Sequence, residues 1–406
     1  MSATFFEVES EKPLEFESMA IRSRAQAPPP AATPGPPRGT PRPHGSAQRN
    51  GRNAARVSAS KWKLAWTRDL EPGFAPSFVL QAGERIALQE PDSWSLLDRD
   101  GRVLRREARG PGDLVLDADQ GLLYTTDPNG FVAATQLADG EPRFLVAAYF
   151  GRGWAREVLA QQGSRLLIES VELPGMAEPR RNPEYGVFEV QDLGSPVQTE
   201  EGQVTSARRL VAVMSRSRPL LTAMDGDASV VAVPGHVSRL DARLRVTADH
   251  GADFEPLALS VDELGRAHLV VRSGKETRLW VVTREGDRTL DVALAVAPDT
   301  IAAPPIVGYD HTVYVVARDR VLAVAADGSQ VREYEAGRSI AGAVATADPA
   351  LVVATGRELV RFDAAGERRL LLALPENLIT PPTVAADGAM LAASTAHLFR
   401  LVPEKP

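Results

Sequence analysis

The sequence IAAPPIVGYDHTVYVVARDRVLAVAADGSQVREYEAGR, residues 301–338, holds four short strand-like pieces separated by turns. Apolar, β-branched and aromatic residues fill the pieces at 305–307, 312–317, 321–325 and 331–334. Asp327 and Gly328 stand between the last two pieces, where a tight hairpin turn needs residues that tolerate a positive φ. The stretch therefore predicts four antiparallel strands in about 40 residues, which is the size of one structural repeat.

One such unit cannot bury both of its faces, so its neighbours should resemble it. The first apolar position of the second strand recurs about every 40 residues, at Ile86, Leu123, Leu166, Val230, His268, Val313, Leu351 and Met390. Eight such positions predict an all-β fold, a single β-propeller of eight four-stranded blades. Seven blades stay possible, because the interval after Leu166 is long and irregular.

The last repeat ends before its outer strand. Residues 379–402 supply the inner strands of a C-terminal blade, and the chain stops soon after them. The piece at 62–70, around Trp66, has the pattern of the missing strand. We expect it to pair with the C-terminal blade and close the ring, since closure removes two exposed sheet edges. The propeller is thus predicted to span residues 61–403.

Residues 1–60 have a different composition. Residues 1–20 mix aromatic residues with five glutamates, and residues 27–43 contain eight prolines. Such a segment buries too little apolar surface to offset its ordering entropy, so a disordered arm is predicted. The first part is either a plain tail or a docking peptide on a tether. The docking peptide would use four apolar anchors, namely Phe5, Phe6, Leu14 and Phe16.

Two segments break the repeat after Leu166. Residues 173–185, LPGMAEPRRNPEY, read as an inserted Pro-rich loop, and residues 192–203 form a second polar excursion. Insertions in repeat folds map to loops on one face, often the binding face, although a tolerated surface loop remains an alternative. The candidate partner-binding residues of the loop are of types enriched at interfaces, namely Met176, Arg180, Arg181 and Tyr185.

The sequence contains none of the common motifs that carry chemistry. The chain has no cysteine, which removes disulfides, thiolate zinc sites and cysteine nucleophiles. Phosphate-binding loops, dinucleotide fingerprints and the common hydrolase motifs do not occur. The six histidines are scattered, and the Asp-rich turns lack the later glutamate of a calcium loop. We therefore expect no cofactor, no metal and no catalytic residue.

Charge and hydropathy limit the class of partner. The net charge is −7, and seven arginines without any acid lie in residues 21–60, so the remainder is more acidic than the whole. An acidic globule is a poor binder of duplex nucleic acid. No apolar run reaches the length of a membrane helix, roughly 18 residues. The N-terminus lacks the apolar core of a secretion signal, so a cytoplasmic location is expected, with the cell envelope as the alternative if translation starts elsewhere.

The unit DHTVYVVARDRVLAVAADGSQVREYEAG resembles the repeat of quinoprotein-like propellers, through Asp310, 313–315, 321–322 and 327–328. In that family a tryptophan docks on a glycine, and Trp66 with Gly73 is similar to such a pair. The resemblance implies the scaffold rather than a reaction. The quinone enzymes of the family use a vicinal disulfide and a calcium site, and no residues here match either. The lipobox of its envelope lipoproteins is also missing.

The function expected from these observations is a non-catalytic scaffold that binds protein partners through a propeller face and through the arm. The alternatives are a propeller enzyme with an axial site, either a hydrolase, a lyase or a quinone-linked dehydrogenase, and a propeller of an envelope-assembly complex. The sequence leaves the oligomeric state open.

Overall fold

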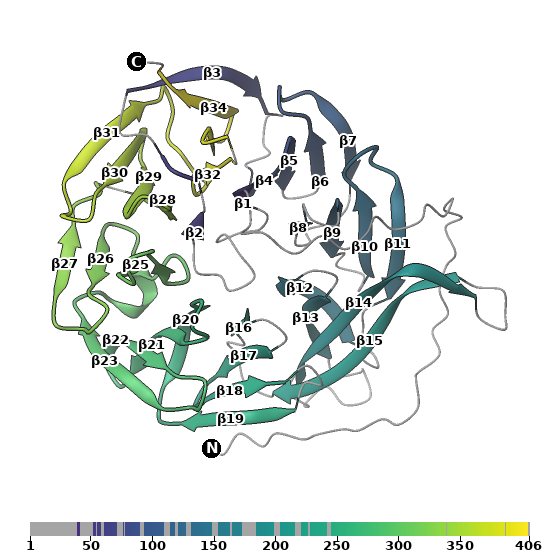
Figure 1. The fold of residues 1–406 in the computed structure, drawn as a ribbon, viewed down its shortest axis with the longest axis horizontal. Coiled ribbons are helices and arrows are strands. Elements are labelled where there is room, and N and C mark those ends of the chain that lie inside the picture. Colours follow the sequence, from purple (N-terminus) through teal and green to yellow (C-terminus); the bar gives the residue numbers. More distant parts are fainter. Residues whose placement is uncertain are drawn as a thin grey trace.

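The computed structural model is a ring of small sheets around one axis (Figure 1). It describes residues 39–40, 52–53, 55–57, 61–70, 76, 78–89, 93–108, 114–117, 121–126, 131–147, 153–162, 165–172, 184–198, 204–215, 221–225, 228–241, 245–337, 339–385 and 387–404. These described residues form eight sheets, and each of the eight aligned positions lies in the second strand of its own sheet. The fold is the predicted all-β propeller, with eight blades rather than seven.

The chain builds its blades in order, and each blade begins at the axis and ends at the rim (Figure 1). Blade 1 contains β4 (Phe78–Ala82), β5 (Arg85–Gln89), β6 (Ser93–Leu97) and β7 (Val103–Ala108). Blade 2 contains β8 (Leu114–Asp117), β9 (Leu122–Thr126), β10 (Phe131–Gln136) and β11 (Pro142–Ala147). Blade 3 contains β12 (Gly153–Gln162), β13 (Arg165–Glu172), β14 (Glu184–Gln198) and β15 (Val204–Ser215). Blade 4 contains β16 (Leu221–Asp225), β17 (Ala228–Val233), β18 (His236–Leu240) and β19 (Val246–Gly251).

The second half of the ring repeats this plan. Blade 5 contains β20 (Glu255–Val261), β21 (Ala267–Ser273), β22 (Glu276–Val282) and β23 (Arg288–Leu294), followed by the 3-10 turn η1 (Pro298–Thr300). Blade 6 contains β24 (Ile306–Val307), β25 (Val313–Val316), β26 (Val321–Val324) and β27 (Val331–Tyr334). Blade 7 contains β28 (Ile340–Thr346), β29 (Ala350–Thr355), β30 (Glu358–Phe362) and β31 (Arg368–Ala373). Blade 8 contains β32 (Thr383–Val384), β33 (Met390–Ala393), β34 (His397–Pro403) and, from the N-terminal part, β3 (Trp62–Asp69).

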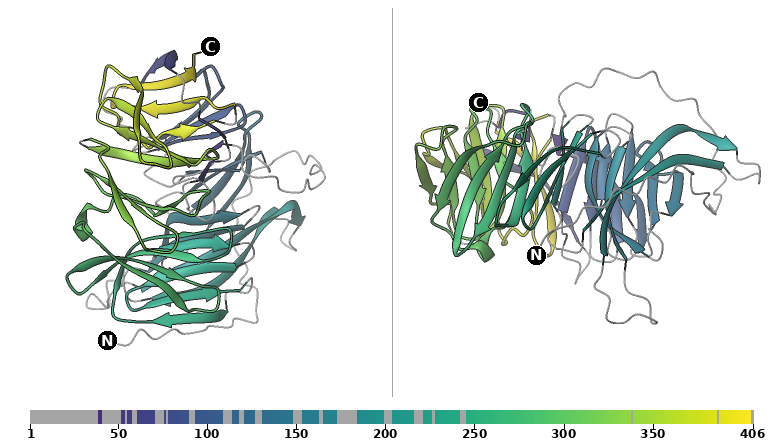
Figure 2. Two further views of the ribbon diagram at one scale, coloured as in Figure 1. Left: turned by 60° about the vertical axis from the view of Figure 1, so that its left-hand side comes forward. Right: turned by 90° about the horizontal axis from the view of Figure 1, so that it is seen from below.

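The ring closes as the sequence predicted. Strand β3 pairs antiparallel with β34, from Trp62 opposite Pro403 to Asp69 opposite His397. The pairing supplies the outer strand that the C-terminal blade lacks, so the outer edge of β34 and one edge of β3 are satisfied. The two ends of the propeller therefore share one blade (Figures 1 and 2).

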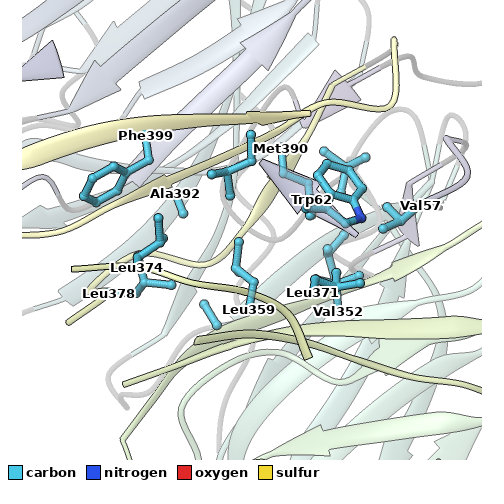
Figure 3. Close-up of a cluster of buried hydrophobic side chains, with 14 residues drawn as sticks. Val57, Trp62, Val352, Leu359, Leu371, Leu374, Leu378, Met390, Ala392 and Phe399 are labelled. Atoms are coloured by element: carbon cyan, nitrogen blue, oxygen red, sulfur yellow. The ribbon is translucent and has the colours of Figure 1, made fainter. Parts of the chain in front are cut away.

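Apolar side chains fill the spaces between neighbouring blades. A cluster between blades 7 and 8 includes Val352, Leu371, Met390 and Phe399, all buried (Figure 3). Comparable clusters join blades 1 and 2, 4 and 5, 5 and 6, 6 and 7, and 8 and 1. Each blade thus buries its faces against its neighbours, which is why one repeat alone would not be stable.

Glycines in the turns between third and fourth strands hold successive blades together. Gly101 has φ +81°, and a Cβ there would lie 3.2 Å from Cη2 of Trp66 in the preceding blade. Tyr334 packs in the same way on Gly366. The docking expected for Trp66 is therefore present, but its described partner is Gly101, and Gly73 lies outside the described residues. The pairing with Gly73 stays a prediction, and the contact with Gly101 is one between neighbouring repeats.

Blade 3 departs from the repeat at its outer strands. Strands β14 and β15 pair with each other as far as Gln198 opposite Val204, whereas β13 pairs with β14 only as far as Gln191. The end of this hairpin extends away from the ring (Figures 1 and 2). The predicted polar excursion at 192–203 thus contains the ends of a β-ribbon, and its residues 199–203 lie outside the described part.

Two further strands come from the expected arm. Strand β1 (Gly39–Thr40) pairs antiparallel with β4, and β2 (Arg52–Asn53) pairs parallel with β28. Both lie on the axial side of the blades (Figure 1). The predicted boundary at residue 61 and the disorder of residues 1–60 stay predictions, but the described residues of that segment contact the propeller.

Candidate functional site

Part of the N-terminal segment lies on the axial side of the ring, where β1 and β2 pair with inner strands. We call the end of the ring with the turns between first and second strands the lower end. First strands run toward this end, so β1, antiparallel to β4, runs away from it, and β2, parallel to β28, returns to it. Each added strand satisfies backbone groups on the exposed axial edge of an inner strand. The axial edges of β4 and β28 thus each pair with an added strand.

Asn53 is the polar anchor of this segment. The residue is only 2% exposed, and its Nδ2 donates to the carbonyl oxygen of Val384 at 2.8 Å. Its Oδ1 accepts from the backbone N–H of Ala55 at 2.8 Å, which turns the chain as it leaves β2. Asn53 itself pairs with Thr346 of β28, so one residue links the inner strands of blades 7 and 8.

Val57 is the apolar anchor. It is fully buried and packs with Trp62 in the cluster between blades 7 and 8, where Figure 3 shows both side chains beside Met390, Leu371 and Val352. Burying a valine side chain in this way stabilises by roughly 1.5–3 kcal/mol. The segment thus continues the core of the ring beyond the strands themselves.

Backbone bonds at the lower end fix the segment between these anchors. Ala347 donates its N–H to the carbonyl oxygen of Ala55 at 3.2 Å. The N–H of Val57 donates to Oδ1 of Asp348 at 3.3 Å, while Oδ2 of the same carboxylate accepts from Arg361 at 2.8 Å. Arg56, between the anchors, is exposed. We call this site the axial groove. It is made by β28, the turn at 347–348, Val384 and the apolar side chains around Val57.

A buried ionic group lies at the lower end of blade 5. Asp262 is fully buried, accepts from Arg266 through Nε at 2.7 Å and lies 3.1 Å from Nε2 of His268. Burial raises the pKa of Asp262, but the hydrogen bonds from His268 and Arg266 outweigh it and hold that pKa well below its usual range. The carboxylate also accepts backbone N–H groups of Leu264 and Arg266. It therefore organises a turn and is shielded from any substrate.

A histidine joins the strands of the seam at the other end. His397 lies 2.8 Å from Oε1 of Glu376 and 3.3 Å from Oδ1 of Asp69, which is on β3. Hydrogen bonds from His397 and Ser394 lower the pKa of Glu376. Ser394 bonds to Glu376 and to backbone groups of its own turn, rather than to an imidazole nitrogen. The arrangement favours a structural contact over an activated nucleophile.

Blades 5 and 6 expose apolar groups at the lower end. Leu264 is 55% exposed and Tyr309 is 40% exposed. Between them, Nδ1 of His311 lies 3.5 Å from Oε1 of Glu263. His311 has φ +63°, a position that glycine fills in the matching turns, as at Gly265 and Gly388. This conformation costs a non-glycine residue free energy.

Most of the predicted partner-binding residues lie outside the described part of the chain, namely Phe5, Phe6, Leu14, Phe16, Met176, Arg180 and Arg181. Tyr185 lies in β14, opposite Val171 of β13 and Ser215 of β15. Residues 184 and 185, predicted as the end of the inserted loop, are thus the first two residues of this strand. The role of these residues stays a prediction.

The axial groove was missed in the sequence. Asn53 and Val57 were assigned to the disordered arm because the prolines and arginines before them dominate the composition. Residues 52–57, RNAARV, contain no proline, but this feature alone does not single out Asn53 or Val57 as buried residues. Within the residues that the structure describes, no group of three His, Cys, Asp or Glu side chains is placed to hold a metal. The same residues include no helix with the length and apolarity needed to cross a membrane.

Comparison with known proteins gives the fold. No family model matches the chain, and no curated protein matches it in sequence. Among solved structures, the quinohemoprotein alcohol dehydrogenase from Comamonas testosteroni superposes with a TM-score of 0.60 at 12% identity, covering 91% of this chain and 81% of the other. At the level of fold, this chain resembles the quinoprotein-like β-propellers.

Two other propellers superpose similarly. BamB from Moraxella catarrhalis has a TM-score of 0.55 at 13% identity, covering 84% of this chain and 97% of that one. The Dos1 propeller has a TM-score of 0.61 at 9% identity, covering 85% and 96%. These similarities bear out the resemblance read from residues 310–328. At such identities they concern the scaffold alone, because one propeller fold hosts many functions.

Proposed function

We propose that the protein is a non-catalytic scaffold that binds protein partners as extended segments, through the propeller and through its N-terminal arm. The observation that carries this proposal is the addition of β1 and β2 to the axial edges of β4 and β28. Strand addition is a common mode of peptide recognition, in which backbone hydrogen bonds supply affinity and side-chain pockets supply specificity. The inserted loop at 173–185 and the anchors in residues 1–20 would supply further contacts.

The ionisable groups of the described residues support this choice over an axial enzyme. Asp262, in the turn before β21, pairs with His268 of that strand, and both are buried, while Glu376 and His397 hold the seam. Each of these groups is engaged with a neighbouring strand or turn. Structural ion pairs also perturb the pKa of a carboxylate, so the lowered pKa values of Asp262 and Glu376 are accounted for by these contacts.

The proposal is tested by affinity purification of three tagged proteins: the full chain, a chain lacking residues 1–20, and a chain with Arg180, Arg181 and Tyr185 changed to alanine. A scaffold predicts a partner that co-purifies in fixed stoichiometry, is lost from at least one variant and rebinds when mixed as a purified protein. A full chain that purifies alone from its native cells, under conditions that preserve other complexes, would contradict the proposal. Circular dichroism of each variant verifies that the propeller is folded.

A further inference from the structure

The axial groove has the properties of a peptide site. Its components belong to the ring itself: the edge of β28, the carbonyl of Val384, the N–H of Ala347 and the carboxylate of Asp348. Residues 52–53 and 55–57 lie against these groups and are joined to the ring by backbone hydrogen bonds and by the buried side chains of Asn53 and Val57. Nothing in these contacts requires the segment to be covalently continuous with the propeller.

The contacts define a pattern in the occupant. Asn53 uses both ends of its amide, because Nδ2 donates to Val384 and Oδ1 accepts from Ala55. Four residues later, Val57 is fully buried among the apolar side chains of the cluster between blades 7 and 8. Arg56 is exposed and its carbonyl passes over Gly388, where an added Cβ would lie 3.4 Å from it. The groove thus recognises an asparagine at position i and a β-branched aliphatic residue at position i+4.

Replacing either anchor of the occupant would make its binding to the groove less favourable. Without an asparagine amide the Val384 carbonyl would lose a buried donor, and a buried polar group without a partner is costly. Without an aliphatic side chain the pocket beside Trp62 would be empty, and dispersion contacts would be lost. Selectivity therefore follows from the same two residues that provide the binding.

We propose that the axial groove is a peptide-binding site whose resident occupant is the protein's own residues 52–57, and that it accepts from a partner an extended segment with asparagine followed four residues later by valine or isoleucine. This inference rests on the proposed scaffold function and names the segment that such a partner presents. The resident segment competes at an effective concentration in the millimolar range, typical of a short tether. A partner displaces it by additional contacts elsewhere on the ring.

The test uses the full chain in three forms: the native sequence, the Asn53→Ala/Val57→Ala variant and the Arg56→Ala control. The probe is a fluorescent peptide of residues 50–58, and anisotropy reports its binding. The double variant weakens the resident segment, so it should bind the peptide at least tenfold more tightly than the native chain does. The Arg56→Ala chain should behave as the native one. A peptide with Asn53→Ala and Val57→Ala should bind the double variant at least tenfold more weakly than the native peptide.

A second measurement avoids dependence on the folding of the variant. In the native chain, a millimolar excess of the unlabelled peptide should accelerate hydrogen exchange in residues 52–57, and the doubly changed peptide should not. Equal affinity of both peptides for the double variant, or unchanged exchange in the native chain, would overturn the inference. Neither outcome depends on capturing a partner. The affinity purification described above would therefore still detect a scaffold that binds its partner only through the loop at 173–185.

Discussion

The side-chain amide of Asn53 donates a hydrogen bond to the carbonyl oxygen of Val384, 2.8 Å away, across 331 positions of sequence. The bond is buried and lies between the inner strands of blades 7 and 8. It joins the N-terminal segment to the blade that β3 completes at its rim. The ring is thus closed twice, by strand β3 at the outside and by Asn53 at the axis.

Changing Asn53 to alanine should lower the free energy of unfolding by about 1–3 kcal/mol, because a buried carbonyl loses its donor. Chemical denaturation, with the midpoint and slope both measured, checks this value. The exposed neighbour Arg56 supplies the control, and Arg56→Ala should stay within about 0.5 kcal/mol of the native chain. Equal stabilities of the two variants would mean that the axial contact contributes nothing.

The docking of Trp66 on Gly101 makes a second prediction. Gly101→Ala introduces a Cβ at φ +81° that meets the tryptophan ring at 3.2 Å. Gly274 has φ +61° with open space around it, so Gly274→Ala carries the backbone strain alone, about 1–2 kcal/mol. Gly101→Ala should be less stable than Gly274→Ala by at least about 1 kcal/mol in thermal or chemical unfolding. A smaller loss at Gly101 than at Gly274 would show that the contact between blades 8 and 1 is unimportant.

The buried Asp262 predicts an acid dependence of stability. Its folded-state pKa lies below the unfolded value, which is about 3.9. Its contribution is therefore complete above that unfolded pKa and is lost as the pH falls through the acid range toward the folded value. In the Asp262→Asn variant, the free energy of unfolding should be lower by roughly 3 kcal/mol at pH 7, and the difference should shrink between pH 4 and pH 2. A difference that stays constant over this range would contradict the assignment.

His311 and Ser339 are the described non-glycine residues with a positive φ, +63° and +59°. Replacing either with glycine should relieve backbone strain and raise the free energy of unfolding by about 0.5–1 kcal/mol. The exposed contact between His311 and Glu263 contributes little and should not reverse the sign. If His311→Gly destabilised the protein while Ser339→Gly stabilised it, the contact of His311 with Glu263 would contribute more free energy than the backbone strain costs. Differential scanning calorimetry on both variants distinguishes these cases.

The repeat in residues 301–338 predicted much of the architecture, because the period of four strands and the turn residues are local properties of the chain. Strand positions in blade 6, the eight repeats and the pairing of β3 with the C-terminal blade are all confirmed. The contact of Trp66 with Gly101 on the next blade was not predicted, because it is set by packing rather than by sequence proximity.

The axial groove could not be predicted from the sequence. Asn53 is polar and surrounded by residues typical of a linker, and only its approach to Val384, late in the sequence, makes it a buried residue. Contacts between such distant positions depend on how the ring closes, which no local pattern contains. Val57 is likewise far in the sequence from most of its core cluster, which comes from residues 344–401. Its burial therefore also depends on how the ring closes.

Hydrogen exchange of the native full chain tests the central claim most directly. In residues 52–57 the N–H of Val57 donates to Asp348 and the carbonyl of Ala55 accepts from Ala347 at the end of β28. We predict that the amides of Val57 and Ala347 exchange slowly, opening together, and that Asn53→Ala accelerates both. Exchange of residues 52–57 at the rate of an unstructured peptide, unaffected by that substitution, would contradict the account of an axial segment that binds the ring.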